Sequence, residues 1–118
     1  MIRLHGIANC DTVKRARAWL TAQDRPHEFV DFKKKLPTEG DLRRWSQALG
    51  GVDVLVNRRG TTWRQLDEAQ RESAGSADGA LALLQSKTSL IKRPVVEWED
   101  GAVTAGFDEA GWQQRLGG

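Results

Sequence analysis

Apolar and polar positions along the first quarter of the chain follow two different periods. Residues 2–6 form a short run that predicts a first strand, and residues 27–32 read as a second. Between these runs, apolar side chains recur at steps of three and four, the spacing of one helix face: Val13, Ala16, Trp19 and Leu20. Residues that favour helix N-caps stand at the start of this stretch: Asn9, Asp11 and Thr12. The pattern predicts a β-α-β unit.

A second helix is predicted from about residue 38 to residue 49. Thr38 is its expected N-cap, and Asp41, three residues later, completes an acidic variant of the capping box. The pair Gly50–Gly51 follows the last apolar position and is expected to end the helix.

The next stretch is less regular. Either Thr61 or Thr62 is expected to cap a brief helical segment that holds Trp63. Residues 71–76 read as a loop, and residues 77–86 as a further helix.

The last quarter predicts a hairpin and a helix. Residues 94–98 and 102–105 read as two strands, joined by a turn that contains Asp100–Gly101, a strong hairpin signal. Residues 108–116 are predicted to form the final helix. The resulting order, β-α-β-α…α-β-β-α, is that of a thioredoxin-like fold. Periodicity alone leaves other small layered α/β folds open.

Composition narrows the class of protein. The chain has 118 residues, which favours one domain spanning 1–118. The net charge is only +2 and the basic residues are interspersed with acidic ones, so a nucleic-acid surface is not expected. No apolar run is long enough for a signal peptide or a membrane span. The single cysteine excludes an internal disulfide and a multi-cysteine zinc site. We therefore expect a cytoplasmic protein, monomeric by default, with no metal and no bound cofactor.

That cysteine, Cys10, lies just after a predicted strand and at the start of a predicted helix. Unbonded backbone N–H groups and the positive end of the helix dipole stabilise a thiolate at such a position. The alternative is an inert, buried cysteine. Position alone leaves the two alternatives evenly balanced.

Three sequence motifs, which follow one another along the chain, give further information about the fold and function. They are residues 6–14 around Cys10, the basic turn at 58–64, and the run Leu-Ile-Lys-Arg-Pro-Val-Val at 90–96. Together, over about residues 2–116, they resemble the arsenate reductase (ArsC)-like family, specifically its YffB-type branch, which is related to the Spx-type regulators.

The resemblance implies an α/β fold of the thioredoxin type, a mixed sheet flanked by helices, with an inserted helical region at about 38–88. It implies that Cys10 is the nucleophile and that Pro94 is a cis-proline beside it, which brings Arg93 close. In arsenate reductases, arginines bind the oxyanion and stabilise the thiolate: Arg93 matches one such position, and Arg58 or Arg59 lies near a second. A guanidinium suits this task because its planar fork binds an oxyanion or a carboxylate through two hydrogen bonds.

The chain also departs from the arsenate reductases. Their third oxyanion arginine falls near Gly106–Phe107, and the histidine that precedes their cysteine by four residues aligns with Gly6, one residue from His5. Spx-type regulators typically carry Cys-x-x-Cys, whereas Cys10 has no second cysteine three residues later.

These points favour a glutathione-dependent thiol reductase, in which Cys10 forms a mixed disulfide and an external thiol resolves it. Glutathione is the expected co-substrate, with an unknown oxidised substrate as the second partner. The candidate binding residues are Asn9, Lys14, Arg58, Arg59 and Arg93. Two alternatives remain open: a glutathione-coupled arsenate reductase, and a non-enzymatic interaction module of the Spx type.

Overall fold

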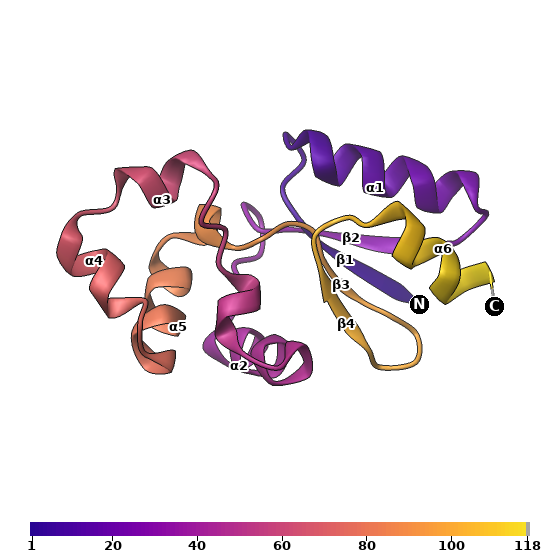
Figure 1. Cartoon of the computed structure of the whole chain (residues 1–118). Coiled ribbons are helices and arrows are strands. Elements are labelled where there is room, and N and C mark those ends of the chain that lie inside the picture. Colours follow the sequence, from indigo (N-terminus) through magenta and orange to yellow (C-terminus); the bar gives the residue numbers. More distant parts are fainter. Residues whose placement is uncertain (118) are drawn as a thin grey trace. The chain divides into compact units, whose positions relative to one another are not determined.

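The computed structural model describes residues 1–117, which form two compact units. The first unit combines the chain from Met1 to Lys34 with the chain from Arg93 onward, and the second unit is Lys35–Lys92 (Figure 1). The single domain with an insertion at about 38–88 stays a prediction. No helix within the described residues is long and apolar enough to cross a membrane.

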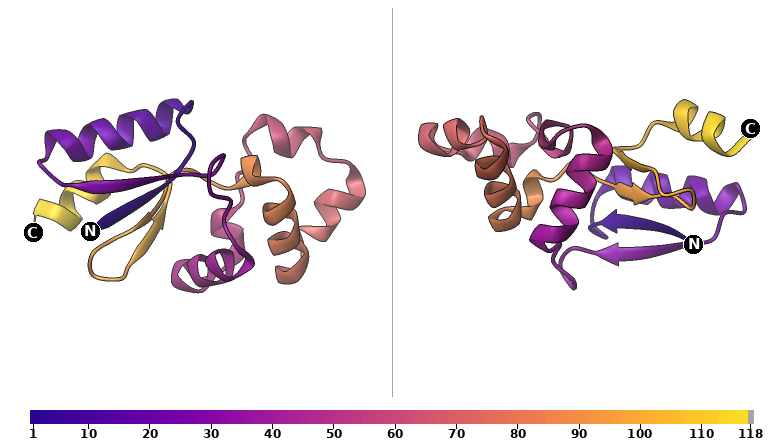
Figure 2. Two further views of the ribbon diagram at one scale, coloured as in Figure 1. Left: turned by 180° about the vertical axis from the view of Figure 1, so that it is seen from behind. Right: turned by 90° about the horizontal axis from the view of Figure 1, so that it is seen from below.

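The first unit is a four-stranded mixed sheet with two helices. Strand β1 pairs in parallel with β2, and β3 pairs antiparallel with both β1 and β4, which gives the order β2-β1-β3-β4 (Figure 2). The elements are β1 (Ile2–Gly6), α1 (Asp11–Ala22), β2 (His27–Asp31), β3 (Val95–Glu97), β4 (Val103–Ala105) and α6 (Glu109–Gly117). The predicted mixed sheet flanked by helices is confirmed.

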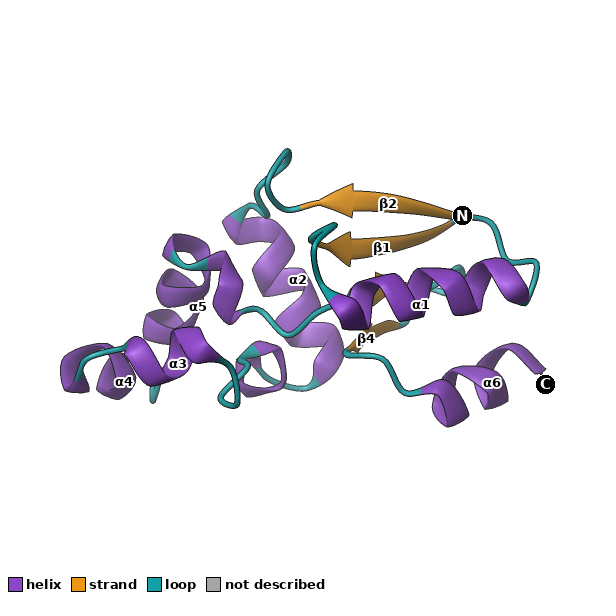
Figure 3. Cartoon of the chain, turned by 90° about the horizontal axis from the view of Figure 1, so that it is seen from above, coloured by secondary structure: helices purple, strands orange, loops and turns teal. Residues whose placement is uncertain are grey.

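Helices α1 and α6 lie on the same face of this sheet (Figure 3). Their buried side chains join those of β1 and β3 in one core: Ile2, Leu4, Val13, Ala16, Leu20, Val96, Trp98 and Trp112. Trp112 forms edge-to-face contacts with Trp98 and Phe107, at 5.0 and 4.7 Å between ring centroids. Aromatic packing of this kind contributes beyond the area that it buries, so the contacts of Trp112 help to hold α6 on the sheet.

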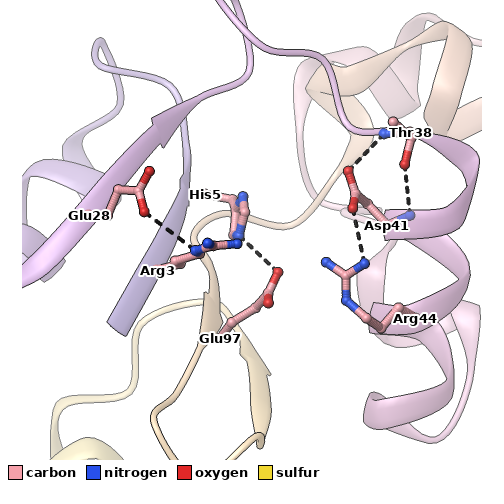
Figure 4. Close-up of polar contacts among 7 residues, drawn as sticks. All are labelled: Arg3, His5, Glu28, Thr38, Asp41, Arg44 and Glu97. Atoms are coloured by element: carbon pink, nitrogen blue, oxygen red, sulfur yellow. Dashed lines mark hydrogen bonds and ion pairs between the residues drawn. The ribbon is translucent and has the colours of Figure 1, made fainter. Parts of the chain in front are cut away.

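The opposite face of β1 carries polar side chains, because successive residues of a strand point to opposite faces. His5 is buried there, and its Nε2 lies 3.0 Å from Oε1 of Glu97 (Figure 4). Arg3, on the same face, forms an exposed ion pair with Glu28 at 3.4 Å. His5 is thus engaged by a neighbouring strand on the face that turns away from α1.

The second unit consists of helices and 3₁₀ turns, with an isolated antiparallel bridge between Val56 and Ile91. Its elements are α2 (Glu39–Leu49), the short 3₁₀ turn η1 (Val52–Leu55), α3 (Thr61–Gln65), α4 (Glu68–Ser73), α5 (Ala77–Ser86) and the 3₁₀ turn η2 (Thr88–Leu90). Helix α2 starts at the predicted capping box of Thr38 and Asp41, and Gly50 ends it in the left-handed conformation, with φ of 87°. Both predictions are confirmed.

Three local predictions were wrong. Residues 71–76 were expected to be a loop, but the first three of them belong to α4. This helix starts after its N-cap Asp67, which forms a capping box with Gln70. The N-cap of α3 is Gly60, and Thr61 is already the first helical residue. The N-cap of α1 is Cys10 itself, rather than Asn9, Asp11 or Thr12.

Candidate active site

Cys10 occupies the N-cap position of α1. Its backbone is extended, with φ of −142° and ψ of 121°, and no side chain caps the helix. Its carbonyl oxygen accepts the first helical hydrogen bond, from the backbone N–H of Lys14 at 2.9 Å. The N–H groups of the first turn have no partner within a helix by construction. The thiol therefore stands where backbone donors and the helix dipole both favour a negative charge.

The end of β1 approaches the first turn of α1 closely. A Cβ atom built on Gly6 would lie 2.8 Å from Cγ2 of Val13, which is closer than real Cβ contacts. Only a glycine therefore lets the last residue of β1 pack against the first turn of α1. Cys10 is partly exposed and packs at the border of the core beneath α1.

The Arg93–Pro94 segment reaches the same end of the sheet. Strand β3 pairs with β1 so that Val95 faces His5, and the next antiparallel pair in that register is Pro94 with Gly6. Gly6 leads directly into the loop that ends at Cys10. The Arg93–Pro94 peptide bond is cis, Pro94 is buried, and Arg93 is partly exposed. Fold topology thus brings Arg93 and Pro94 to the end of the sheet where α1 starts.

The remaining candidates near Cys10 in the sequence are solvent-facing. Asn9 and Lys14 are exposed, and so is Asp11, the first residue of α1. The carboxylate of Asp11 stabilises the helix N-terminus but opposes a second negative charge beside it. Lys14 supplies a positive charge one turn into the helix. Their roles toward glutathione stay predictions.

The basic turn belongs to the second unit. Arg58 and Arg59 are both exposed, but their side chains differ. The guanidinium of Arg58 donates to Oδ1 of Asp53 at 3.0 Å and lies 5.2 Å from the ring centre of Trp63. Trp63, which is half-buried, is therefore partly covered by a cation.

The position of the family's third arginine holds no cation. Gly106 adopts a left-handed backbone, with φ of 87°, and its N–H donates to the carbonyl oxygen of Pro94 at 2.9 Å. Phe107 packs against the ring of Trp112, which lies on α6. The sequence shows that the arginine is absent, but it does not show that the N–H of Gly106 bonds to the backbone of Pro94. A glycine directly after a short strand was the available signal. Among residues 1–117, no group of three or more His, Cys, Asp or Glu side chains could hold a metal ion.

Comparison with known proteins agrees with this arrangement. The model of the ArsC family matches residues 5–115, from β1 into α6. The chain belongs to the ArsC family. A relative from Haemophilus influenzae, described as an uncharacterized protein, is 42% identical over 116 residues, and the alignment covers 96% of each chain. The global transcriptional regulator Spx of Staphylococcus epidermidis is 24% identical over 110 residues, which cover 92% of this chain and 82% of that one.

Solved structures of family members share the fold. A YFFB protein matches with a TM-score of 0.90 and 37% identity, covering 98% of this chain and 99% of that one. An arsenate reductase (ArsC) related protein from Brucella melitensis matches with a TM-score of 0.76 and 35% identity, covering 96% and 92%. The predicted thioredoxin-like α/β fold and the relation to the arsenate reductases are confirmed.

Proposed function

We propose that this ArsC-family protein is a glutathione-dependent thiol reductase with Cys10 as its only redox-active group. The observation that carries the proposal is the start of α1. The single cysteine of the chain is the N-cap of a twelve-residue helix whose end no side chain closes. A thiolate at this point replaces the missing cap acceptor, and the thiolate is the reactive form of cysteine.

The proposed cycle has two exchange steps. The thiolate of Cys10 attacks the sulfur of glutathione in a mixed disulfide, RSSG. A disulfide bond forms between the sulfur of Cys10 and the sulfur of glutathione, the S–S bond of RSSG breaks, and RS⁻ leaves and takes up a proton. The thiolate of a second glutathione then attacks the glutathione sulfur of this intermediate, which releases the thiolate of Cys10 and oxidised glutathione. The net reaction is RSSG + GSH → RSH + GSSG, so the two electrons come from glutathione.

Arg93 is the proposed electrostatic partner in this cycle. It precedes Pro94 at the end of the sheet where Cys10 lies, and it is partly exposed. The positive charge of Arg93 stabilises the Cys10 thiolate that leaves in the second step. Its planar guanidinium can bind a carboxylate of glutathione through two hydrogen bonds. Asn9, Lys14, Arg58 and Arg59 are proposed to contribute to glutathione binding. A free thiol of this kind favours a reducing compartment such as the cytoplasm.

Reduction of a glutathione mixed disulfide, coupled to glutathione reductase and NADPH, tests the proposal. The intact protein is expected to turn over the substrate and, with oxidised glutathione, to gain the mass of one glutathionyl group. Cys10→Ser is expected to do neither. Arg93→Ala is expected to slow turnover by about tenfold and Arg93→Lys by less, because lysine keeps the charge without the fork. Activity of Cys10→Ser equal to that of the intact protein would refute the proposal.

Two family-based alternatives are tested with the same proteins. The similarity to the arsenate reductase related protein of Brucella melitensis favours arsenate as a possible substrate, whereas the glycine and phenylalanine at 106 and 107 weigh against it. Glutathione-dependent arsenite formation by the intact protein would support that alternative. The similarity to Spx favours a non-enzymatic partner role. Absence of any thiol transfer, with a partner retained equally by Cys10→Ser, would support this third reading.

A further inference from the structure

Strand β4 lies at one edge of the sheet, so only one side of its backbone bonds to a neighbouring strand (Figure 3). The N–H of Gly106 donates to the carbonyl oxygen of Pro94 at 2.9 Å. Residues that bond to the neighbour alternate along an antiparallel ladder, so Thr104 also directs its N–H and C=O groups toward β3. The N–H and C=O groups of Val103 and Ala105 therefore point outward. Within residues 1–117, these outward groups have no hydrogen-bond partner.

A groove of about 280 Å³ lies between this free edge and α6. Thr104 contributes to the strand side of the groove, and its Oγ1 accepts a hydrogen bond at 3.0 Å from Nε1 of Trp98, a core residue on the face that α6 covers. Trp112, whose ring packs against Trp98, lies on the helix side, together with Gly111 and Arg115. The groove therefore offers aromatic surface beside the unpaired backbone groups of β4.

The free charge of the groove is negative. Asp108 lines it just beyond the end of β4, and a Cβ atom on Gly111 would lie 2.5 Å from Oδ2 of Asp108, so the glycine leaves room for this carboxylate. Asp108 is exposed, and within residues 1–117 no hydrogen bond or ion pair engages its side chain. Arg115, the cation of the groove, already forms an ion pair with Asp100 at 3.4 Å. A ligand that carries a positive charge therefore complements this site.

We propose that the free edge of β4 and the groove beside α6 bind an extended peptide segment of a partner protein, which adds to the sheet as a further strand. Such a segment, antiparallel to β4, can exchange two hydrogen bonds with each of Val103 and Ala105. The peptide residue between these two pairs lies opposite Thr104, and its side chain points into the groove. The residue two positions earlier lies opposite Gly106, beside Asp108. The expected pattern is a basic residue, any residue, and then an apolar residue.

A second copy of this chain is the other candidate occupant of the edge. Strand β4 has three residues, Val103–Ala105, and short edge strands limit pairing between copies. The segment from Glu99 to Asp108 contains no lysine or arginine, so the β4 region of a second copy cannot place a basic side chain beside Asp108. Charge complementarity therefore favours a segment of a different protein.

The probe is the peptide acetyl-Ser-Thr-Lys-Thr-Leu-Thr-Ser-amide, whose leucine is expected opposite Thr104 and whose lysine is expected opposite Gly106. The control peptide carries N-methyl groups on the two threonines that flank the leucine, which removes the donors toward β4 but keeps the charge. Amide hydrogen exchange is followed by NMR on the reduced protein, independently of any chemistry at Cys10. At saturation, the probe is expected to slow exchange at Val103 and Ala105 by about tenfold or more, and at Thr104 by less than about twofold. The N-methylated peptide is expected to slow none of them.

Two substitutions test the backbone edge and the charge separately. Ala105→Pro removes one outward donor, and proline is tolerated on an edge strand where its N–H would face solvent. This variant is expected to bind the probe about tenfold more weakly, whereas Ala105→Ser, which keeps the donor, should bind it like the intact protein. Asp108→Asn is expected to weaken binding by about threefold. Glu72→Gln, on α4, is the charge-matched control and is expected to leave binding unchanged.

Unchanged exchange at Val103 and Ala105 in millimolar probe, or equal protection by the N-methylated peptide, overturns the inference. A dimer in sedimentation that protects the same two amides without any peptide also overturns it, because the occupant is then a second copy. Equal binding by Asp108→Asn and the intact protein overturns the assignment of a basic partner. If urea titration shows that Ala105→Pro is unfolded, the comparison of the two peptides on the intact protein decides the role of the edge.

Discussion

The first two helices of the chain begin in opposite ways. Helix α2 is closed at its start: Oγ1 of Thr38 accepts from the N–H of Asp41, and a carboxylate oxygen of Asp41 accepts from the N–H of Thr38, both at 3.0 Å (Figure 4). Arg44 adds an ion pair to Asp41 at 3.1 Å. Helix α1 is open at its start, because Cys10 occupies the N-cap and no side chain bonds to the first turn.

The difference separates stability from chemistry. A capping box satisfies two backbone groups and typically adds about 1 kcal/mol to the free energy of unfolding. An open helix start forgoes that gain and keeps its N–H groups for a thiolate or a bound anion. Threonine and aspartate, which cap helices better than cysteine, stand at the start of α2, where no chemistry is proposed. The poorer cap, cysteine, stands where the proposed chemistry takes place.

Closing the open helix is the change with the largest expected effect. In Cys10→Ser, the hydroxyl is a strong N-cap acceptor, so we expect the free energy of unfolding to rise by about 0.5–1 kcal/mol while thiol transfer falls to background. Urea unfolding and the coupled reductase assay measure the two effects on one protein. A serine variant less stable than the intact protein would show that the packing of the sulfur outweighs the cap.

The second largest effect is expected from Gly6→Ala, which forces β1 and α1 apart. In Gly6→Ala, the new methyl group meets Cγ2 of Val13 at 2.8 Å, so we expect the free energy of unfolding to fall by about 1–3 kcal/mol. Val13→Ala costs stability by itself because Val13 is buried in the core, but Gly6→Ala should cost less in that background than in the intact protein, since the clashing atom is gone.

The control for that experiment lies in the closed helix. A Cβ atom at Gly40, inside α2, would lie 3.6 Å from Oγ1 of Thr38, an ordinary contact. Gly40→Ala is therefore expected to raise stability by about 0.5–1 kcal/mol, as alanine does in helices. Equal effects of the two alanine substitutions in urea unfolding would contradict the steric account of Gly6.

Opening the closed helix has a smaller effect. Thr38→Ala removes the acceptor for the N–H of Asp41 and is expected to lower the free energy of unfolding by about 1 kcal/mol. Thr38→Ser keeps the acceptor and should be nearly neutral. Neither variant should alter the rate at which iodoacetamide alkylates Cys10. A Thr38→Ser protein as unstable as Thr38→Ala would mean that the methyl group, rather than the hydrogen bond, carries the effect.

Acid weakens the same cap. Partial burial raises the pKa of Asp41, but the hydrogen bonds from the Thr38 backbone and from Arg44 outweigh it, so this pKa lies below its ordinary value. A carboxyl whose pKa is depressed in the folded state stabilises that state above the unfolded pKa of about 3.9. The contribution is lost as the pH falls through the folded pKa. We expect Asp41→Asn to flatten this part of the stability profile below about pH 4, measured by urea unfolding. An identical slope in both proteins would contradict the assignment.

Much of the fold could be predicted because the signals are local. Thr38, Asp41 and Gly50 act within a few residues of one another, and the hairpin signal of Asp100–Gly101 lies inside its own turn. Helix α4 was missed because its cap, Asp67, precedes the serine- and glycine-containing stretch that suggested a loop. The N-cap of α1 was missed because cysteine is a poor cap and polar residues stand on both sides of it.

In the candidate site, too, some features follow from the local sequence and others only from the tertiary structure. The sequence by itself determined that a lone cysteine lies at a strand-to-helix junction and that arginines stand before a proline and in a turn. Only the tertiary structure decided that the pairing of β1 with β3 brings Pro94 to the Gly6 end of β1, that the N–H of Gly106 donates to the Pro94 carbonyl, and that Asp53 and Trp63 engage Arg58. Caps and turns are set by neighbours along the chain. The register of β1 against β3 joins residues about ninety positions apart, which no local pattern predicts. The partners of Arg58 lie only five residues away on either side, but the three-dimensional path of the turn decides whether they meet it.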